Sequence, residues 1–142
     1  LLNFGHTIGH SIEKLMNFSL LHGECVSLGI VSASYLSMLL EHISKQEYEE
    51  ILATLESFHL PITLKKFDVP KLENHLDTNS NEISGENLNI TLEAAEVVAA
   101  TKNDKKMDSG KIKFILLKEI GNAYINRELS DEQIMLSTQE VL

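Results

Sequence analysis

Three of the six histidines in this 142-residue sequence lie close together near its start. His6 and His10 are four residues apart, a spacing that places both imidazoles on one face of a helix, about 6 Å apart. His22 follows twelve residues after His10. Imidazole nitrogens arranged in this way can bind a divalent metal or a single substrate group. Catalytic zinc commonly takes three protein ligands, so a pair of these histidines on a metal would still leave one ligand to be found.

A metal shared by His6 and His22 requires a particular path for the chain between them. If a helix covers residues 5–16, its far end lies about 15 Å from His6, at 1.5 Å per residue. Residues 17–21, extended at about 3.3 Å each, can retrace that distance. We therefore predict that residues 17–21 run extended, back along the first helix. A shared metal also requires His6 and His22 to lie within about 10 Å of each other, two helical turns or less.

The residues after His22 leave two roles open for Glu24. Gly23 can let backbone or ligand approach closely, and Glu24 then lies in the first turn of the next helix, where the helix dipole favours a carboxylate. Glu24 could instead accept a hydrogen bond from a metal-binding histidine. The other histidines have no such neighbours and are interpreted as surface or capping residues: His42, His59 and His75.

Apolar residues at helical spacing predict a mostly helical domain around these side chains. The helices are expected at residues 5–16, 23–42, 45–58 (with Ser44 and Glu47 as a capping box), 71–76, 92–102 (capped by Thr91) and after Ser130. The second of them is apolar or small on nearly every face, which predicts burial on most sides. Alternating residues at 110–117 and 123–126 predict a hairpin. The predicted fold class is mainly α, a compact multi-helix domain at residues 1–142 with a small β-hairpin near the C-terminus.

Composition narrows the classes of partner. The net charge of −9 and the pI near 5.1 argue against nucleic acid or an anionic membrane as the main partner, since both favour basic surfaces. The single cysteine, Cys25, cannot form an internal disulfide, which is typical of a cytoplasmic protein. The most apolar stretch, residues 25–40, is interrupted by serines, so no membrane-spanning segment is predicted.

Five short motifs together resemble one enzyme family. They are Leu-Asn-Phe-Gly-His-Thr-Ile-Gly-His-Ser-Ile-Glu at residues 2–13, Leu-His-Gly-Glu at 21–24, Asp-Lys-Lys at 104–106, Gly-Lys-Ile-Lys-Phe at 110–114 and Ile-Gly at 120–121. In order and spacing the set is similar to the C-terminal half of 3-dehydroquinate synthase. The departures are Cys25, where the family often has alanine, and the polar residues 77–90; neither lies in a motif.

The resemblance implies a lyase of the shikimate pathway, which leads to the aromatic amino acids. Such an enzyme converts 3-deoxy-D-arabino-heptulosonate 7-phosphate into 3-dehydroquinate and phosphate, using NAD and a divalent metal, zinc or possibly cobalt. In the family's scheme NAD transiently oxidises a ring hydroxyl, phosphate is eliminated, the ketone is reduced, and the ring opens and closes by an aldol step. The implied partners are a phosphorylated sugar acid substrate, an N-terminal NAD-binding domain and a second copy in a homodimer.

The resemblance also assigns roles to individual residues. By position, the metal ligands are His6 and His22, the residue that moves the proton at the oxidised hydroxyl is His10, and the substrate-binding residues are Asn3, Lys105 and Lys106. These roles are chemically reasonable, since a histidine titrates near neutrality and lysines attract a phosphoryl group. Taken without the family pattern, Lys105 and Lys106 would be interpreted as complementing the negative end of the preceding helix.

We expect this sequence to be part of a longer enzyme. It begins at Leu1 rather than methionine, and it has no Gly-rich strand-turn-helix signal for dinucleotide binding. The NAD-binding domain and the glutamate that completes the family's metal site are therefore expected upstream. The chain alone should bind zinc weakly, through two histidines and water, and should not turn over substrate.

Three alternatives stay open at this point. A related sugar-phosphate cyclase, or a metal-dependent polyol or alcohol dehydrogenase of the same superfamily, would share the paired histidines. The Asp-Lys-Lys motif at residues 104–106 favours dehydroquinate synthase over the dehydrogenases, which bind no phosphoryl group there. From a different class, the chain could be a non-catalytic helical interaction module with structural histidines.

Overall fold

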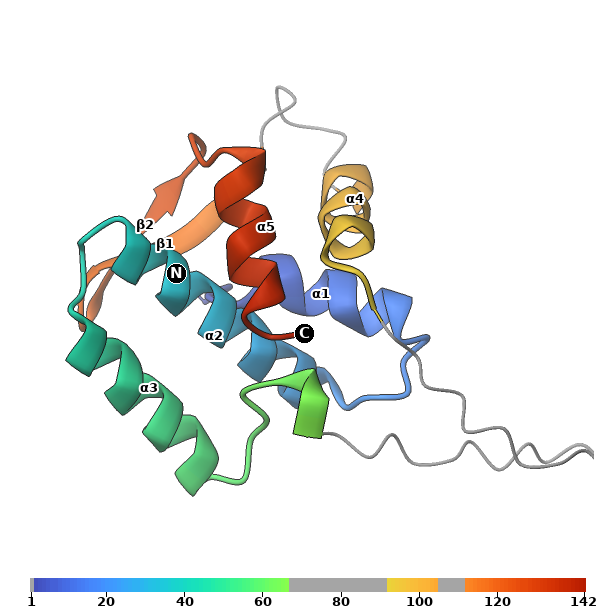
Figure 1. Ribbon diagram of the computed structural model, residues 1–142, viewed down its shortest axis with the longest axis horizontal. Helices are drawn as coiled ribbons and strands as arrows, with labels where there is room; N and C mark the ends of the chain where they lie inside the picture. The colour runs from blue at the N-terminus through green and yellow to red at the C-terminus, as the bar shows by residue number, and fades with distance from the viewer. Residues whose placement is uncertain (1, 67–91, 105–111) are drawn as a thin grey trace, which may run out of the picture.

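A computed structural model describes residues 2–66, 92–104 and 112–142 of the chain (Figure 1). Within these ranges the elements are α1 (His6–Leu15), α2 (His22–Leu39), α3 (Lys45–Ser57), the short 3₁₀ helix η1 (Leu64–Lys66), α4 (Ala94–Asp104), β1 (Phe114–Glu119), β2 (Asn122–Asn126) and α5 (Asp131–Gln139). The predicted class, mainly α with a small hairpin near the C-terminus, is confirmed. The predicted short helix at 71–76, the polar loop after it and the Thr91 cap lie outside the described ranges.

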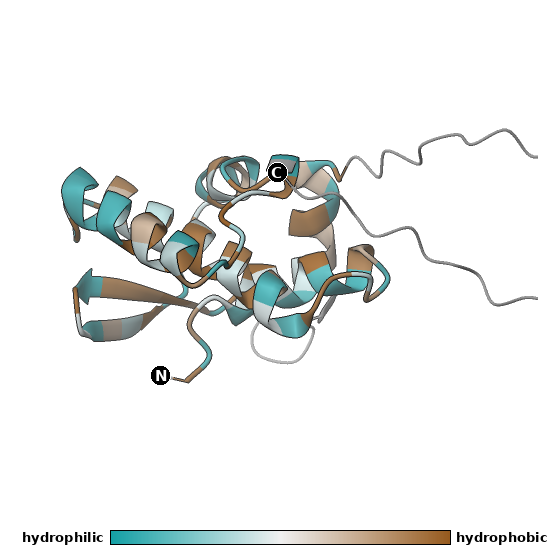
Figure 2. Ribbon diagram, turned by 90° about the horizontal axis from the view of Figure 1, so that it is seen from below, coloured by the Kyte–Doolittle hydropathy of each residue, from teal (hydrophilic) through white to brown (hydrophobic). Residues whose placement is uncertain are grey.

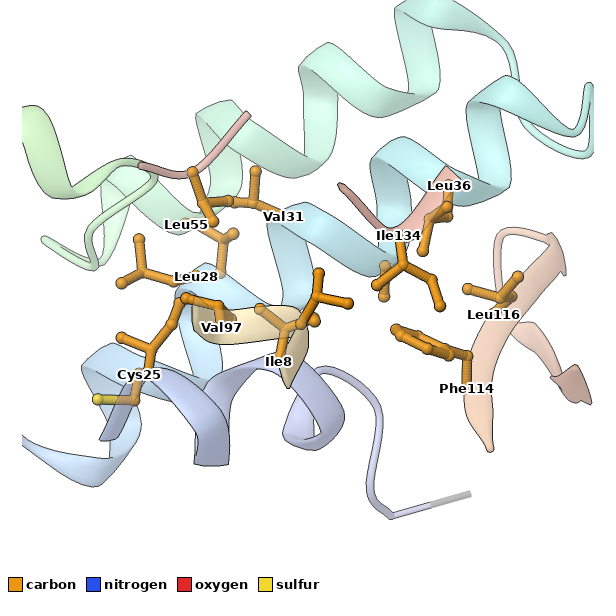
Figure 3. Packing of buried hydrophobic residues seen from close by; sticks show 14 of the residues in the cluster. Ile8, Cys25, Leu28, Val31, Leu36, Leu55, Val97, Phe114, Leu116 and Ile134 are labelled. Atoms are coloured by element: carbon orange, nitrogen blue, oxygen red, sulfur yellow. The ribbon is translucent and has the colours of Figure 1, made fainter. Parts of the chain in front are cut away.

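Helix α2 is the centre of the domain. It contacts α1, α3, α5 and β1, and its Leu28 and Leu36 are fully buried. Figure 3 shows its side chains in one cluster with apolar residues of the other helices and of β1, among them Ile8, Val97 and Phe114. The prediction of a helix buried on most sides is therefore confirmed. Buried apolar residues of the other helices belong to the same core, and Figure 2 shows apolar and polar stretches alternating along the helix ribbons.

Glycines let α1 and α2 cross at backbone contact. A Cβ added to Gly29 would lie 2.7 Å from the carbonyl carbon of Gly5 and 2.9 Å from the nitrogen of Gly9. Gly5 itself has φ of +79°, which disfavours a side chain. The helices run antiparallel, since Gly5 lies against Gly29 and Gly9 against Cys25. This crossing fixes the distance between the beginning of α1 and the helix that starts with His22.

The connection between α1 and α2 differs from the prediction. Residues 17–21 were expected to be extended, but Asn17 and Phe18 have φ values of 51° and 58°. The N–H groups of Asn17 and Phe18 donate to the carbonyls of Lys14 and Glu13, which is the Schellman closure of a helix C-terminus. The chain therefore reverses over two left-handed residues before Leu21 becomes extended. The extended prediction is wrong for residues 17 and 18, because their N–H groups bond to the unpaired carbonyls of the helix end.

The ends of α2 and α3 close in the same way. Glu41 and His59 have positive φ, and each is followed by a residue whose N–H bonds back to the helix. Helix α2 therefore ends at Leu39, three residues before the predicted end. His59 is a capping residue, as predicted, and His42 is half-buried with its Nδ1 3.2 Å from the hydroxyl of Tyr124.

The remaining elements follow the sequence closely. Ser44 caps α3 and pairs reciprocally with Glu47, as predicted, and Ser130 caps α5. Strands β1 and β2 pair antiparallel around a turn at Ile120 and Gly121. None of the helices in the described ranges combines the length and hydrophobicity needed to cross a lipid bilayer.

Candidate metal centre

The three N-terminal histidines meet at one place. His6 and His10 lie one turn apart on α1, and His22 is the first residue of α2. Their ring centroids are 5.1 Å apart for His6 and His10, and 5.6 Å apart for each pair that includes His22. The distance between His6 and His22 is therefore well inside the limit that a shared metal requires. The two helices bring the rings together although the connecting residues take an unexpected path.

The donor set fits a divalent metal. One nitrogen from each of the three rings can be chosen so that all lie within 4.8 Å of one another. Two nitrogens bound to a tetrahedral zinc lie about 3.4 Å apart, at about 2.1 Å from the ion. Each ring therefore needs to move by less than about 1 Å to coordinate. His6 and His10 are half-buried and His22 is exposed, so a substrate group can approach the centre from one side.

Hydrogen bonds orient the rings of His6 and His22. Nδ1 of His6 lies 3.2 Å from the carbonyl oxygen of Phe4, and Nδ1 of His22 lies 3.2 Å from a carboxylate oxygen of Glu13. A carbonyl and a carboxylate only accept, so both Nδ1 atoms carry the proton. In the neutral ring this leaves Nε2 of His6 and of His22 with the lone pair, the form in which imidazole binds a metal.

Glu24 takes the first of its two predicted roles. Its carboxylate accepts a hydrogen bond of 2.8 Å from the backbone N–H of Leu21, at the positive end of α2. The carboxylate beside a histidine is that of Glu13 instead. Glu24 is therefore a helix-capping residue, and the alternative of a hydrogen bond from Glu24 to a ligating histidine is wrong in this structure.

A pocket opens beside His6 and His10. It is lined by residues from the start of the chain, α1, α4 and the hairpin: Asn3, His6, Thr7, His10, Thr101, Lys113, Ile115 and Ile125. The hydroxyl of Thr7 donates to the carbonyl of Lys113, and Ser11 and Thr101 share a buried hydrogen bond of 2.7 Å. These bonds join α1 to the residue before β1 and to α4. Three elements therefore fix the positions of side chains that line the pocket.

The structure brings together four of the six predicted site residues. Asn3 lines the pocket beside His6 and His10, and His22 completes the cluster. Lys105 and Lys106 lie outside the described residues.

Sequence reasoning gave no role to Glu13, Thr7 or Lys113, which the structure places at the site. One signal was present for Glu13. It lies three and seven residues after His10 and His6, on the same face of the helix. Thr7 and Lys113 meet only through the fold, so no spacing rule could have paired them.

Cys25 is close to this region in sequence but is no ligand. Its side chain is fully buried, and burial, with smaller contributions from Glu13 and Glu24, raises the pKa of its thiol to about 11. The converging ligand set in the described part of the chain consists of the three histidines alone.

Comparison with known proteins identifies the family. A family model described as the 3-dehydroquinate synthase C-terminal domain matches residues 1–82, more than half of the chain. The chain belongs to the 3-dehydroquinate synthase family. The resemblance seen in the sequence motifs is therefore confirmed.

Individual relatives agree with this membership. The chain is 43% identical over 110 residues to a 3-dehydroquinate synthase of Acetivibrio thermocellus, covering 75% of the chain and 30% of the relative. It is 33% identical over 135 residues to that of Thermodesulfovibrio yellowstonii, covering 94% of the chain and 31% of the relative. The chain thus spans about 30% of the length of these two relatives.

Two solved structures share the fold. One is ValA, a 2-epi-5-epi-valiolone synthase from Streptomyces hygroscopicus with NAD+ and Zn2+ bound: the TM-score is 0.70 and the identity 20%, over 96% of this chain and 31% of that one. The other is a 2-deoxy-scyllo-inosose synthase complexed with carbaglucose-6-phosphate, NAD+ and Co2+: the TM-score is 0.66 and the identity 18%, over 99% of this chain and 34% of that one. At these identities the likeness describes the fold of the domain.

Proposed function

We propose that this chain is the metal- and substrate-binding part of a 3-dehydroquinate synthase. The enzyme would convert 3-deoxy-D-arabino-heptulosonate 7-phosphate into 3-dehydroquinate and phosphate, a carbon–oxygen lyase reaction. The observation that carries the proposal is the convergence of three imidazoles, two of them oriented through Nδ1, in a chain of this family. The alternatives receive less support, because identity is 33–43% to dehydroquinate synthases and 18–20% to the two other cyclases.

His6 and His22 are the proposed metal ligands. Both have an acceptor at Nδ1, which leaves Nε2 to coordinate. Bound zinc, or possibly cobalt, would lower the pKa of a coordinated substrate hydroxyl, and NAD would accept the hydride from the carbon that carries this hydroxyl. A further ligand is needed to complete a catalytic site, and we propose that a glutamate of the rest of the enzyme supplies it, together with the NAD-binding domain.

His10 is the proposed proton-transfer residue. It lies 5.1 Å from His6 between ring centroids and lines the pocket into which a substrate ring would enter. A histidine at that position can take the hydroxyl proton and return it later in the reaction. If the substrate ring binds in this pocket beside the metal, the hydroxyl that it presents to the metal would lie between His10 and the two proposed ligands, His6 and His22.

Asn3, Lys105 and Lys106 are the proposed substrate-binding residues. Asn3 lines the pocket and offers an amide to the hydroxyl or carboxylate groups of the sugar acid. The lysines would supply positive charge to the phosphate group. We further propose that the whole enzyme is a cytoplasmic homodimer.

Separate measurements of zinc affinity and of phosphate release distinguish these roles. In the enzyme that contains this chain, His10→Ala should keep zinc affinity within a few-fold and lower the rate of phosphate release by about 10²- to 10⁴-fold. His6→Ala and His22→Ala should lose zinc as well as activity. The isolated chain should release no phosphate from the substrate with NAD and zinc present. Turnover by the isolated chain, or loss of zinc in His10→Ala equal to that in His6→Ala, would overturn the corresponding assignment.

A further inference from the structure

Glu13 lies on the helix face that carries the metal-binding side chains. Its two carboxylate oxygens are 3.2 and 3.3 Å from Nδ1 of His22. The side chain of Glu13 is only 17% exposed, whereas that of His22 is 55% exposed. The shielded member of the pair is therefore the carboxylate, and the exposed member is the histidine that needs orientation.

We propose that Glu13 is the positioning residue of the metal centre, holding His22 so that Nε2 points at the ion. This inference rests on the proposed function, in which His22 is a metal ligand. The carboxylate accepts the Nδ1–H of His22, which fixes both the tautomer and the rotation of the ring. An acceptor carboxylate also raises the basicity of the nitrogen that binds the metal. The helix register supports this role, since the antiparallel crossing at Gly29 brings the start of α2 back beside the second half of α1.

The other two candidate roles for Glu13 fit less well. It does not join the converging ligand atoms, which among the described residues come from histidines alone. It is not a helix cap either, because it lies within α1, which ends at Leu15. His6 obtains the same orientation from the backbone carbonyl of Phe4. Each proposed ligand therefore has a hydrogen-bond acceptor at Nδ1. For His6 it is a backbone carbonyl, and for His22 it is the Glu13 side chain, which mutation can remove.

Zinc titration of Glu13 variants tests the inference. In the enzyme that contains this chain, Glu13→Ala should weaken zinc binding by about 10- to 100-fold, the usual effect of removing such a partner. Glu13→Gln should fall in between, because its amide oxygen still accepts from Nδ1 but carries no charge. In the metal-free protein, nitrogen NMR of His22 should report the Nδ1–H tautomer for the wild type and its loss in Glu13→Ala. A circular-dichroism melting curve checks that each variant is folded.

Glu24→Gln is the matched control. This substitution removes one negative charge two residues from His22. The wild-type Glu24 carboxylate bonds to the backbone of Leu21 rather than to an imidazole. Its zinc affinity and its His22 tautomer should stay at wild-type values. If Glu13→Ala binds zinc as tightly as the wild type, or keeps the Nδ1–H tautomer, the inference is wrong while the proposed function stands. If the wild-type enzyme that contains this chain binds no zinc, the proposed function and the inference both fail.

Discussion

The crossing of α1 and α2 gives the sharpest mutational test of how the site is built. In Gly29→Ala the new Cβ would lie 2.7 Å from the carbonyl carbon of Gly5, 2.9 Å from the nitrogen of Gly9 and closer still to the Gly5 oxygen. Carbon atoms in contact are normally about 3.5 to 4.0 Å apart, so the helices must separate by at least about 1 Å. His6 directly follows Gly5, so this displacement moves one proposed ligand away from His22.

The expected cost has two parts. Overpacking of this kind destabilises a folded domain by about 1 to 3 kcal/mol, which lowers the melting temperature by several degrees, up to roughly 10 °C for a domain of this size. A displacement of about 1 Å at a preorganised centre costs on the order of 100-fold in function. We therefore expect Gly29→Ala to lower both the melting temperature and the zinc affinity.

Gly23→Ala is the matched control for this prediction. Gly23 directly follows His22, yet a Cβ there meets nothing within 4 Å. Alanine is the better helix former, so this variant should melt at or slightly above the wild-type temperature and bind zinc normally. The assay is differential scanning calorimetry followed by zinc titration of all three proteins. If Gly29→Ala behaves like Gly23→Ala in both measurements, the backbone crossing does not set the geometry of the site.

Three further predictions test other parts of the structure. Ser44 holds the pKa of the Glu47 carboxyl below its usual 4.5, so the stabilisation by Glu47 is present above that pH and lost as the pH falls through the folded-state pKa. The difference in melting temperature between wild type and Glu47→Gln should shrink in acid; a difference that grows would contradict this. Cys25, buried and with a thiol pKa near 11, should resist maleimide in the native chain and react once unfolded, whereas fast native labelling would show it accessible. Thr101→Val should destabilise the chain to urea by about 1 to 3 kcal/mol by leaving the buried Ser11 hydroxyl without this partner, and adding Ser11→Ala should cost less than the separate effects combined.

The parts of the structure that were predictable depend on local sequence. The capping box of Ser44 and Glu47 predicts the start of α3. Each of the two side chains, three positions apart, accepts a hydrogen bond from the backbone N–H of the other residue. The apolar and small residues around α2 predict its burial. The spacing of His6 and His10 predicts their shared face.

The rest depends on tertiary contacts that no local pattern contains. The reversal at Asn17 and Phe18 takes left-handed backbone without glycine, so the usual marker of a helix end is missing. The partner of His22 proved to be Glu13 rather than Glu24, because the antiparallel register of α1 and α2 decides which carboxylate is nearest. Chain length showed that His22 could return to His6, and the family resemblance assigned both histidines to one metal.

The central claim is that His6 and His22 together bind a metal. The most direct measurement is zinc stoichiometry and affinity for the enzyme that contains this chain, for its His6→Ala and His22→Ala variants, and for His59→Asn as control. His59 has a positive φ, which asparagine tolerates, and is exposed at the end of α3. We predict one zinc per wild-type and His59→Asn chain, and affinities at least about 100-fold weaker in the other two variants, more than the loss of an outer-shell partner causes. Unchanged zinc binding in both His6→Ala and His22→Ala would contradict the account.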